Sequence, residues 1–308
     1  MRIRFRPVLV LIAVLAATMI APGADAGPSG FAFLEVPAGA RASALSGAFA
    51  TLGEGVEASF WNPAGLAAVK GVEISGAHFE SFQNLRHDQF AVARAMWGGG
   101  LAGSLRAFYS EPITARDELG NEIGTFGGND LEFGLSYGRP LADAFRIGGG
   151  VRILHERIAD LSTDTYAFAA GASWQSPDHP GLRLAAMADH VGPDANFTFA
   201  DGPGQAIPMP IAFQGGASYR FALGGATSFA AALEGRMVRG RPTVGMLGGE
   251  LTHRSGAALR IGTRMNDDAT KFSAGAGYTM GSLRLDYAFV ADQQDVGDSH
   301  RFSFTAHF

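Results

Sequence analysis

The chain contains no cysteine, so it can form neither a disulfide bond nor a thiolate metal site. Beyond its first residues it also lacks a long apolar run, whereas a membrane-spanning helix needs roughly 20 consecutive apolar residues. This absence excludes an α-helical membrane protein. Basic residues are fewer than acidic ones, 24 against 29, which argues against a nucleic-acid partner.

The first 26 residues are typical of a secretory signal peptide. Three arginines precede an apolar run over residues 8–20, and Ala24-Asp25-Ala26 is a small-x-small cleavage site. A membrane anchor is the alternative, but the run is shorter than a span and Pro22-Gly23 interrupts it. We therefore expect an exported chain that begins near Gly27.

From about Val72 onward, segments of roughly ten residues alternate apolar with polar or small side chains, and turn residues separate them. Residues 131–137 and 283–289 are clear cases. Because successive side chains of a strand point to opposite faces, each segment has one apolar face and one face of charge and glycine. A soluble sandwich also alternates, but apolar faces on nearly every strand are typical of a membrane barrel, whose outside contacts lipid.

The expected fold is therefore all-β, a transmembrane antiparallel up-and-down β-barrel of about 14 strands over residues 72–308. The strands are expected at 72–82, 88–97, 100–110, 130–140, 144–156, 164–174, 181–190, 210–220, 227–237, 242–252, 257–265, 270–280, 282–291 and 299–308.

The lengths of the connections support this topology, because bacterial barrels alternate short periplasmic turns with longer external loops. The short connections are Gly98-Gly99, 140–143, 254–256 and Gly281, and the long ones are 111–129, 191–209 and 291–299. These two sets fall on opposite sides. The even strand count then predicts that both termini are periplasmic, with the barrel in the bacterial outer membrane.

The last strand carries Phe302, Phe304 and the final residue Phe308 on one face. This pattern resembles the signal that the outer-membrane barrel-assembly machinery reads, although an edge strand that closes a barrel would look the same. Trp97 and Trp174 fall at expected periplasmic strand ends, where an aromatic girdle would lie.

Residues 27–71 do not alternate, and their small side chains indicate a short helix within 40–50. Asn62 is a plausible N-cap with Pro63 at the first helical position. A segment of this size is expected to form a hatch inside the barrel. The alternative is a periplasmic arm below it.

Residues 33–41 (FLEVPAGAR), 47–50 (GAFA) and 60–67 (FWNPAGLA) closely resemble the start of the PorV/PorQ family, a branch of the FadL-type outer-membrane barrels. Residues 135–137, 285–288 and 300–304 resemble it as well, so the resemblance spans the chain after the signal peptide. In FadL-type barrels a hatch occupies the lumen beneath a pocket for long-chain hydrophobic molecules.

The resemblance implies that Asn62, Pro63 and Ala64 form the hatch turn, with Arg41, Trp61 and Gly65 in the same hatch. FadL-type proteins are much longer and have large external elements. This chain lacks that length.

Charged residues of the strands are expected to face the lumen, because an arginine facing lipid costs roughly 2–4 kcal/mol at the midplane. The inward set comprises Arg106, Glu132, Arg146, Arg152, Glu156, Arg183, Asp189, Glu234, Arg236, Glu250, Arg260, Arg264, Arg284, Asp286 and Arg301. One interpretation is a polar conduit or an anion-attracting ring. The near balance of arginine and acid favours the other, an internal salt-bridge lattice that holds the hatch.

No catalytic residues, metal ligands or cofactor are expected. His155 and Glu156 are adjacent and so point to opposite faces, and neither His-Glu-x-x-His nor Gly-x-Ser-x-Gly occurs in a fitting context. The acidic stretches 266–268 and 292–298 are candidates for calcium, although solvated loops are the commoner case. Gly148-Gly149-Gly150 imitates a phosphate loop, but it lies in a strand and indicates close packing near the hatch.

Two functions are expected from the resemblance. The first is a channel or binder for hydrophobic small molecules, with Phe197 and Phe199 in an apolar mouth. The second is a secretion or surface-assembly component of the type IX kind that recognises exported protein cargo. A purely structural barrel or an outer-membrane hydrolase is less expected. The partners are then outer-membrane lipid, the barrel-assembly machinery, and either a hydrophobic ligand or a protein cargo.

Overall fold

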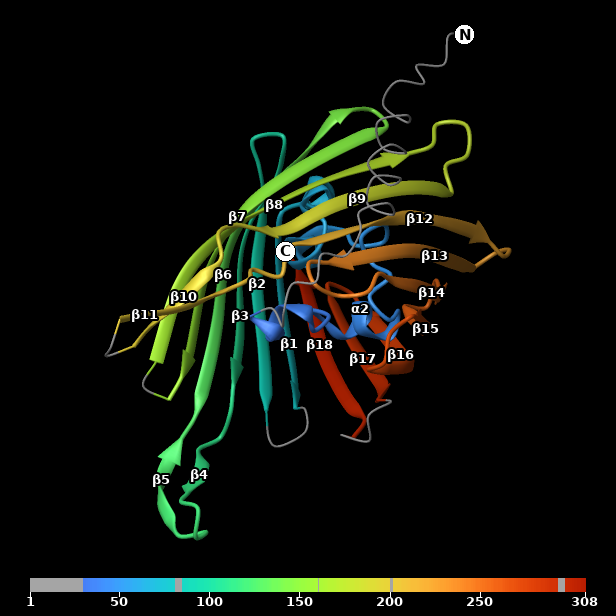
Figure 1. Ribbon diagram of the computed structural model, residues 1–308. Helices are drawn as coiled ribbons and strands as arrows, with labels where there is room; N and C mark the ends of the chain where they lie inside the picture. The colour runs from blue at the N-terminus through green and yellow to red at the C-terminus, as the bar shows by residue number, and fades with distance from the viewer. Residues whose placement is uncertain (1–29, 81–84, 160, 200–201, 293–296) are drawn as a thin grey trace.

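A computed structural model describes residues 30–80, 85–159, 161–199, 202–292 and 297–308 (Figure 1). The expected signal peptide lies outside these residues. Fourteen antiparallel strands form a closed barrel in which each strand pairs with its neighbours along the chain and the last returns to the first. The prediction of an all-β, antiparallel up-and-down barrel of about 14 strands is therefore confirmed.

The barrel strands lie within three residues of the expected bounds. They are β1 (Val72–Glu80), β2 (Arg86–Met96), β3 (Gly99–Tyr109), β6 (Gly128–Ala142), β7 (Phe145–Ile158), β8 (Leu161–Gln175), β9 (Leu182–Val191), β12 (Ala212–Ala222), β13 (Thr227–Val238), β14 (Val244–His253), β15 (Ala257–Met265), β16 (Thr270–Met280), β17 (Leu283–Asp292) and β18 (Ser299–His307).

Two long connections differ from the expectation because each contains a hairpin. β4 (Ile113–Arg116) pairs with β5 (Glu122–Phe126), and β10 (Ala195–Phe199) pairs with β11 (Gly202–Ile207). These strands have four to six residues each. The sequence did not reveal them because so short a strand holds too few residues for a period of two to stand out.

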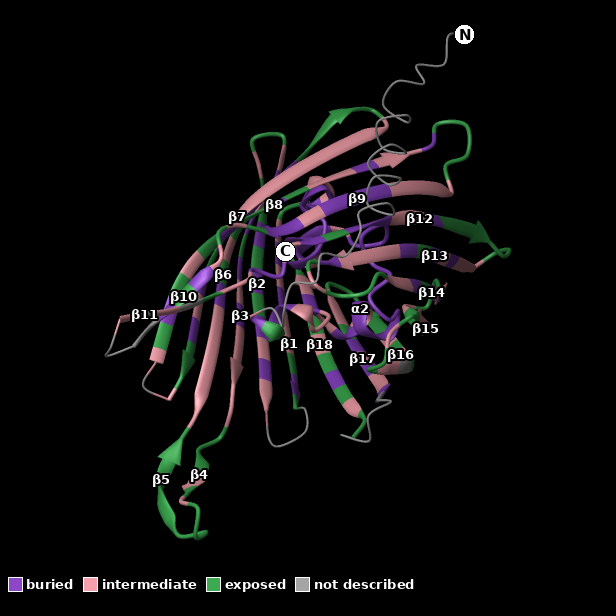
Figure 2. Ribbon diagram, viewed as in Figure 1, coloured by how far each residue is buried: buried purple, intermediate pink, exposed green. Residues whose placement is uncertain are grey.

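The side chains alternate in burial along the strands, as Figure 2 shows. In β7, Arg152, Leu154 and Glu156 are buried on the inner face, while Ile153 between them is 57% exposed on the outer face. Large exposed apolar side chains recur around the barrel, among them Phe133, Phe168, Leu233, Ile261 and Leu285. The barrel therefore has an apolar outside and a polar inside.

The barrel closes where β1 meets β18. The backbone N–H groups of Val72 and Phe308 donate to each other's carbonyls at 3.0 and 2.8 Å, so the two ends of the barrel lie together. We call this end, with the short turns at Gly98 and Gly281, the turn rim. The opposite end carries both hairpins and is called the loop rim.

Four short helical pieces precede the barrel and lie inside it: η1 (Ala32–Glu35), α2 (Ala40–Ala44), η2 (Gly55–Phe60) and η3 (Pro63–Ala68). Together, residues 30–71 form the hatch, which is almost wholly buried and packs on the inner wall (Figure 2). The helix expected within 40–50 is shorter, because Ser46 and Gly47 adopt positive φ of 54° and 85° and turn the chain. In the described part of the chain, no helix is long and apolar enough to cross a membrane.

The hatch runs along the length of the lumen. Gly30 donates its N–H to Pro208 beside the β10–β11 hairpin, and Phe31 donates to the Glu156 carboxylate near the loop-rim end of β7. The first described residue thus lies at the opposite rim from Val72. A periplasmic position for the N-terminus stays a prediction, since residues 1–29 lie outside the described chain.

Candidate functional site

Glycines of the inner wall create the space in which η3 lies. A Cβ at Gly148 would overlap the Pro63 carbonyl, and one at Gly171 would overlap the Asn62 side chain. Gly138 likewise faces the Pro63 carbonyl from β6. Only hydrogen at these positions lets the backbone of the hatch touch the wall. The expected close packing of the glycine run against the hatch therefore occurs at Gly148. A Cβ at Gly149 or Gly150 would instead meet atoms of the neighbouring strands β8 and β6.

Asn62 joins the hatch turn to itself and to the wall. Its Oδ1 accepts from the Ala64 N–H at 3.0 Å, which caps η3, and its Nδ2 donates to the Ala172 carbonyl of β8 at 3.1 Å. The neighbouring Trp61 donates its indole N–H to the Ala38 carbonyl at 3.1 Å. Gly65 packs against the Gly53 carbonyl with no room for a side chain. This turn is therefore fixed by both hydrogen bonds and contact.

A second set of wall glycines receives α2 and the turn after it. Gly262 lies against the backbone of Leu45, and Gly275 lies against Ala44. The Ser46 hydroxyl bonds the Ser273 hydroxyl at 2.7 Å between the two. The hatch is thus seated at two separate places on the wall.

Six charged side chains form a closed ring that joins the hatch to three strands. Arg41 binds Glu250 through two bonds of 2.8 Å, and Arg260 binds both Glu250 at 2.7 Å and Asp286 at 2.8 Å. Arg284 pairs with Asp286 at 2.8 Å and with Glu57, and Glu57 returns to Arg41 at 3.4 Å. The ring alternates in sign and contains three cations and three anions. Such balanced pairing offsets the cost of burying the charges.

Two other arginines hold η2 from the opposite wall. Arg106 of β3 donates to the Phe60 carbonyl at 2.9 Å, and Arg152 of β7 donates to the Ser59 carbonyl at 2.7 Å. Arg152 is among the most deeply buried side chains of the described protein. These hydrogen bonds satisfy backbone carbonyl groups at the C-terminal end of a short helix, which have no partner within the helix.

Carboxylates stand beside both arginines. Glu132 lies 3.5 Å from Arg106 and accepts from His190 at 2.8 Å, and Asp189 lies 3.6 Å from Arg152. The charges are therefore matched in pairs across β3, β6, β7 and β9.

Carboxylates also bind the hatch backbone directly. Glu234 of β13 accepts from the N–H groups of Ala50 and Thr51 at 3.0 and 2.8 Å. At the turn rim, Glu54 of the hatch pairs with Arg146 at 2.7 Å and with Arg183 at 2.9 Å. Together these contacts form a lattice that holds the hatch.

The structure places all the expected lumen charges on the inner face. Several hatch and wall residues in the same lattice were not anticipated, namely Glu54, Glu57, Glu73, Gln89 and Gln214. The inward parity of Glu73, Gln89 and Gln214 in their strands was a usable signal. Glu54 and Glu57 lie in irregular chain that offers no such signal.

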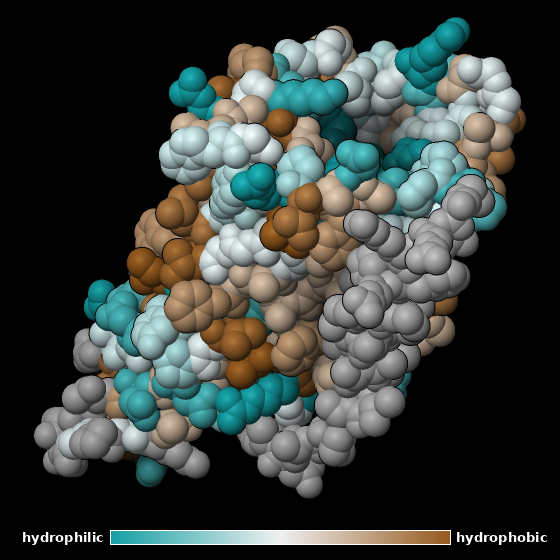
Figure 3. Space-filling view, turned by 90° about the horizontal axis from the view of Figure 1, so that it is seen from above, coloured by the Kyte–Doolittle hydropathy of each residue, from teal (hydrophilic) through white to brown (hydrophobic). Residues whose placement is uncertain are grey.

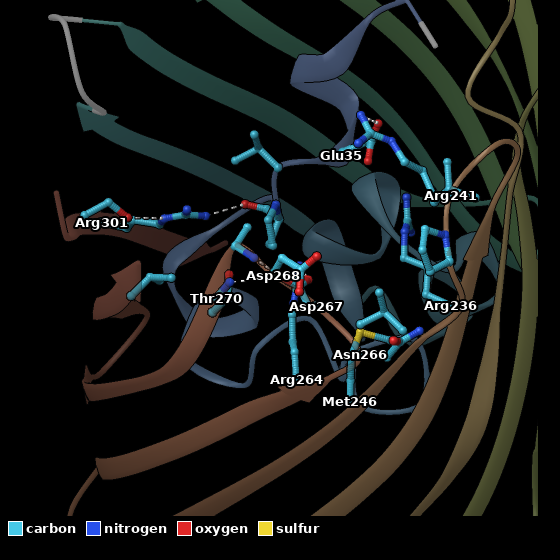
Figure 4. A pocket seen from close by; sticks show the side chains of 18 of the residues that line it. Glu35, Arg236, Arg241, Met246, Arg264, Asn266, Asp267, Asp268, Thr270 and Arg301 are labelled. Atoms are coloured by element: carbon cyan, nitrogen blue, oxygen red, sulfur yellow. Dashed lines mark hydrogen bonds and ion pairs between the residues drawn. The ribbon is translucent and has the colours of Figure 1, made fainter. Parts of the chain in front are cut away.

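A cavity of about 470 Å³ opens above the hatch at the loop rim (Figure 4). Val36 and Pro37 of the hatch line it, and β13 to β18 together with the connections between them contribute most of the remaining residues. Four arginines face it from different sides: Arg236, Arg241, Arg264 and Arg301. Its apolar lining includes Val244, Met246 and Val290.

Two of these arginines are paired with acids. Arg264 binds Asp267 at 2.8 Å, and Arg241 binds Glu35 at 3.2 Å. Burial alone would raise the pKa of the Asp267 carboxyl, but the Arg264 bond and the N–H groups of Ala269 and Thr270 lower that pKa below its ordinary value. Asp267 is therefore a fixed anion at the cavity mouth.

The other expected positions lie outside the lumen. Phe302, Phe304 and Phe308 are exposed, with Phe302 and Phe304 on the outer face of β18 and Phe308 at the turn rim, and Trp97 is exposed at the turn after β2. Trp174 is half-buried opposite Phe145 at the same rim.

The residues considered for catalysis or metal binding do not form a common site in the described part of the chain. His155 faces outward and bonds Asp164 at 2.9 Å, whereas the adjacent Glu156 is buried inside. Across the described ranges, no three His, Cys, Asp or Glu side chains are grouped to hold a metal ion. The calcium candidate at 292–298 lies partly outside those ranges. Phe197 is buried rather than presented at a mouth, and the Phe199 side chain is not described.

The fold is a closed 14-strand antiparallel barrel whose lumen holds short N-terminal helical pieces, an architecture that is FadL-like. Residues 11–149, less than half of the chain, match the model of an uncharacterised protein family, UPF0164. No curated protein matches the sequence.

Solved structures share the fold at low sequence identity. The CymD monoaromatic hydrocarbon channel is 12% identical, with 88% of this chain and 97% of that chain covered and a TM-score of 0.61. The Pseudomonas putida toluene transporter TodX is 12% identical, with 87% and 96% covered and a TM-score of 0.59. A Pseudomonas aeruginosa FadL homologue is 13% identical, with 89% and 98% covered and a TM-score of 0.50.

Proposed function

We propose that this protein is a bacterial outer-membrane barrel that binds hydrophobic small molecules at its loop rim and conducts them inward. The observation that carries the proposal is the cavity of about 470 Å³ above a seated hatch, in a barrel with the fold of hydrocarbon channels. A pocket of this size falls in the range that small-molecule sites occupy.

The outer surface supports the membrane location. Apolar side chains form a broad brown area on the flank of the barrel in Figure 3, bordered by polar ones. A soluble protein rarely exposes so large an apolar area, whereas lipid requires it. With the expected signal peptide, this supports export to the outer membrane with the turn rim in the periplasm. Membership of the PorV/PorQ family, which the sequence resembles, is part of the same proposal.

The membrane location is tested by electrophoresis of the purified protein in SDS with and without boiling. The folded barrel should migrate faster than the boiled chain and should need detergent to stay in solution. A chain that is soluble without detergent and has the same mobility before and after boiling would contradict the proposal.

Ligand binding is tested by mass spectrometry of lipophilic molecules extracted from the purified protein. Val244→Asp places a charge on the apolar part of the cavity lining and should reduce the bound apolar ligand at least tenfold. Leu285→Ala on the outer face serves as the matched control and should retain it. Equal ligand content in wild type and Val244→Asp would show that the cavity is not the site.

A second candidate, a surface-assembly or secretion component, is favoured by the β4–β5 hairpin. The hairpin projects beyond the loop rim, and Leu119 and Ile123 are 86% and 66% exposed (Figure 1). Both strands have an open edge, because among the described residues each pairs only with the other. Open edges and exposed apolar side chains suit a protein partner.

This candidate is tested by co-purification of exported proteins with the wild type and with a variant in which a glycine-serine linker replaces 113–126. A cargo that is retained only by the wild type would favour this function. A cargo retained by both forms would place its contact elsewhere.

A further inference from the structure

We propose that the outer face of the turn rim binds an anionic phospholipid, whose phosphate group lies between Arg94 and Arg139. The rings of Trp97 and Tyr137 belong to the same site. It is separate from the cavity at the loop rim and gives the protein a second kind of ligand. The inference rests on the membrane location proposed above, because only a barrel in a bilayer meets lipid headgroups at this level.

The pairing of solvent-accessible cations differs between the two rims. At the loop rim, four arginines each form an ion pair with at least one carboxylate: Arg86, Arg116, Arg239 and Arg241. Arg157, which donates to the Ala159 carbonyl, is an exception there. At the turn rim, five exposed cations have no carboxylate within 4 Å among the described residues: Lys70, Arg94, Arg139, Arg220 and Arg254. Exposed positive charge without a counter-charge is therefore concentrated at the turn rim.

Two of these cations lie on strands that flank β3. Arg94 of β2 is in register with Leu101 of β3, which is in register with Tyr137 of β6, so all three side chains point to the outer face. Arg139 follows Tyr137 by two residues and shares that face, nearer the rim. Adjacent strands are about 5 Å apart, so the two arginines are separated by about 10 Å across the strands. Their long side chains can converge on one phosphate group.

The turn between β2 and β3 presents Trp97 at a backbone cost. Met96 pairs with Gly99, so the turn consists of Trp97 and Gly98, which both have positive φ, 52° and 74°. Such turns favour Asn-Gly, because positive φ is unfavourable for a bulky residue. The Trp97 side chain is 73% exposed, so packing within the protein does not offset this cost. A contact outside the protein does so, and tryptophan is enriched at the level of lipid headgroups.

Tyr137 holds this tryptophan next to the arginines. Its hydroxyl donates to the Trp97 carbonyl at 2.7 Å, and the two rings meet edge to face with centroids 6.3 Å apart. Toward the middle of the barrel the same face is apolar, with Val92, Phe133 and Leu135 at 37%, 50% and 53% exposed. The site thus combines cations at the rim, aromatic rings beside them and an apolar surface below.

This combination identifies the ligand as an anion with apolar chains. Guanidinium groups form charge-assisted hydrogen bonds with phosphate, and acyl chains cover the apolar surface that inorganic phosphate would leave without contact. A zwitterionic lipid brings a cation of its own, which unpaired arginines repel. Asp143 in the turn after β6 is exposed but forms no ion pair with Arg139 in the described structure, so the site keeps a net positive charge.

The first test measures, by native mass spectrometry, which lipids the detergent-purified wild type retains. Phosphatidylglycerol and phosphatidylcholine with identical acyl chains are added at equal concentration. Phosphatidylglycerol should be retained at least fivefold more, and added salt should reduce the difference. Equal retention of the two lipids would overturn the inference. Complete displacement of phosphatidylglycerol by excess inorganic phosphate would also overturn it, because the site would then recognise phosphate alone.

The second test combines Arg94→Gln with Arg139→Gln. This double variant should retain at least fivefold less phosphatidylglycerol and should keep phosphatidylcholine within twofold of the wild type. Arg220→Gln with Arg254→Gln is the matched control, because it removes the same charge from the same rim on other strands. It should leave the retention of phosphatidylglycerol within twofold. Equal losses in the two double variants would show that rim charge in general attracts the lipid, and would overturn the site.

A third variant, Trp97→Asn, separates the ring from the turn. Asparagine suits the backbone of this turn better than tryptophan, so the variant should fold at least as well. It should nevertheless retain at least threefold less phosphatidylglycerol, because the ring is lost. Retention equal to that of the wild type would contradict the inference.

The outcomes separate this inference from the proposed membrane location. If the two lipids are retained equally, the phospholipid site is wrong while the membrane barrel stands. If neither lipid is retained and the protein stays in solution without detergent, both fail. The wild-type comparison is decisive even where a variant does not fold.

Discussion

Arg41 of the hatch and Glu250 of β14 are joined by two parallel hydrogen bonds, Nε to Oε2 and Nη2 to Oε1, each 2.8 Å long. The two residues are 209 positions apart in the chain. The pair is a planar, two-pronged contact, the geometry in which the guanidinium fork of arginine matches a carboxylate. It connects the hatch, which precedes the barrel in the sequence, to β14 in the C-terminal part of the chain.

Arg41→Met should destabilise the protein strongly, because it leaves Glu250 and Glu57 with one cation fewer in a buried ring. Removal of one partner of a buried pair costs about 3 kcal/mol or more. The free energy of unfolding in denaturant, measured in lipid bilayers, checks this expectation. The conductance of the barrel in a planar bilayer should rise as the hatch loosens.

Arg86→Met is the matched control. Arg86 also pairs with two carboxylates, Glu80 and Glu111, but it is exposed on the outside near the loop rim. Its loss should cost less than about 1 kcal/mol. Equal losses in the two variants would show that the ring does not hold the hatch.

Gly148→Ala should destabilise the seat of the hatch, because the added methyl group meets the rigid backbone of Pro63 and Ala64 rather than a flexible side chain. Overpacking of this kind costs about 1–3 kcal/mol. Gly103→Ala on β3 is the control, since nothing lies within 4 Å of the added Cβ. Denaturation midpoints that fall by the same amount in both variants would refute the contact.

Asn62→Ala should lose both the cap of η3 and the bond to Ala172, whereas Asn62→Ser should lose mainly the second. Loss of a cap costs about 0.5–2 kcal/mol, and serine can cap nearly as well as asparagine. The ordering of stability is therefore wild type, Asn62→Ser, Asn62→Ala. Hydrogen exchange of the Ala64 amide reads the cap directly, and equal exchange in the two variants would contradict this assignment.

Asp267 predicts a pH dependence at the loop rim. Its pKa is lowered in the folded protein, so the stability that it contributes is fully present above the ordinary Asp pKa of about 3.9. That stability is lost as the pH falls through the lower folded value. The difference in stability between wild type and Asp267→Asn should therefore stay constant from pH 7 to about pH 5 and shrink below about pH 4. A difference that vanishes near neutral pH would be incompatible with the bonds from Arg264, Ala269 and Thr270.

The sequence was sufficient for the barrel because the lipid-facing side of each strand must be apolar. Ile153 and Arg152 take opposite faces for that reason alone, and the same parity locates Glu132, Glu250 and Asp286 inside. The alternation of side chains along a strand does not reveal which inward charges form ion pairs with one another. The contact of Arg41 with Glu250, or of Arg284 with Glu57, depends on the path of an irregular hatch.

The hatch itself was predictable only in part. The Asn62-Pro63 turn has a local signature, because a cap and a proline suit the start of a helix. The packing of Phe31 and Leu34 against Leu154 and Met209 near the loop rim has none. Those contacts depend on the chain running the length of the lumen, and no periodic pattern encodes that route.

The closed ring also constrains the order in which the molecule can be completed. Its hatch members, Arg41 and Glu57, are synthesised first, whereas Glu250, Arg260, Arg284 and Asp286 belong to the last third of the chain. Until those strands exist, Arg41 and Glu57 have no partner in the wall and can pair only with each other. The ring can therefore close only after the last strands of the barrel are made, although the Asn62-Pro63 turn contacts strands that are made earlier.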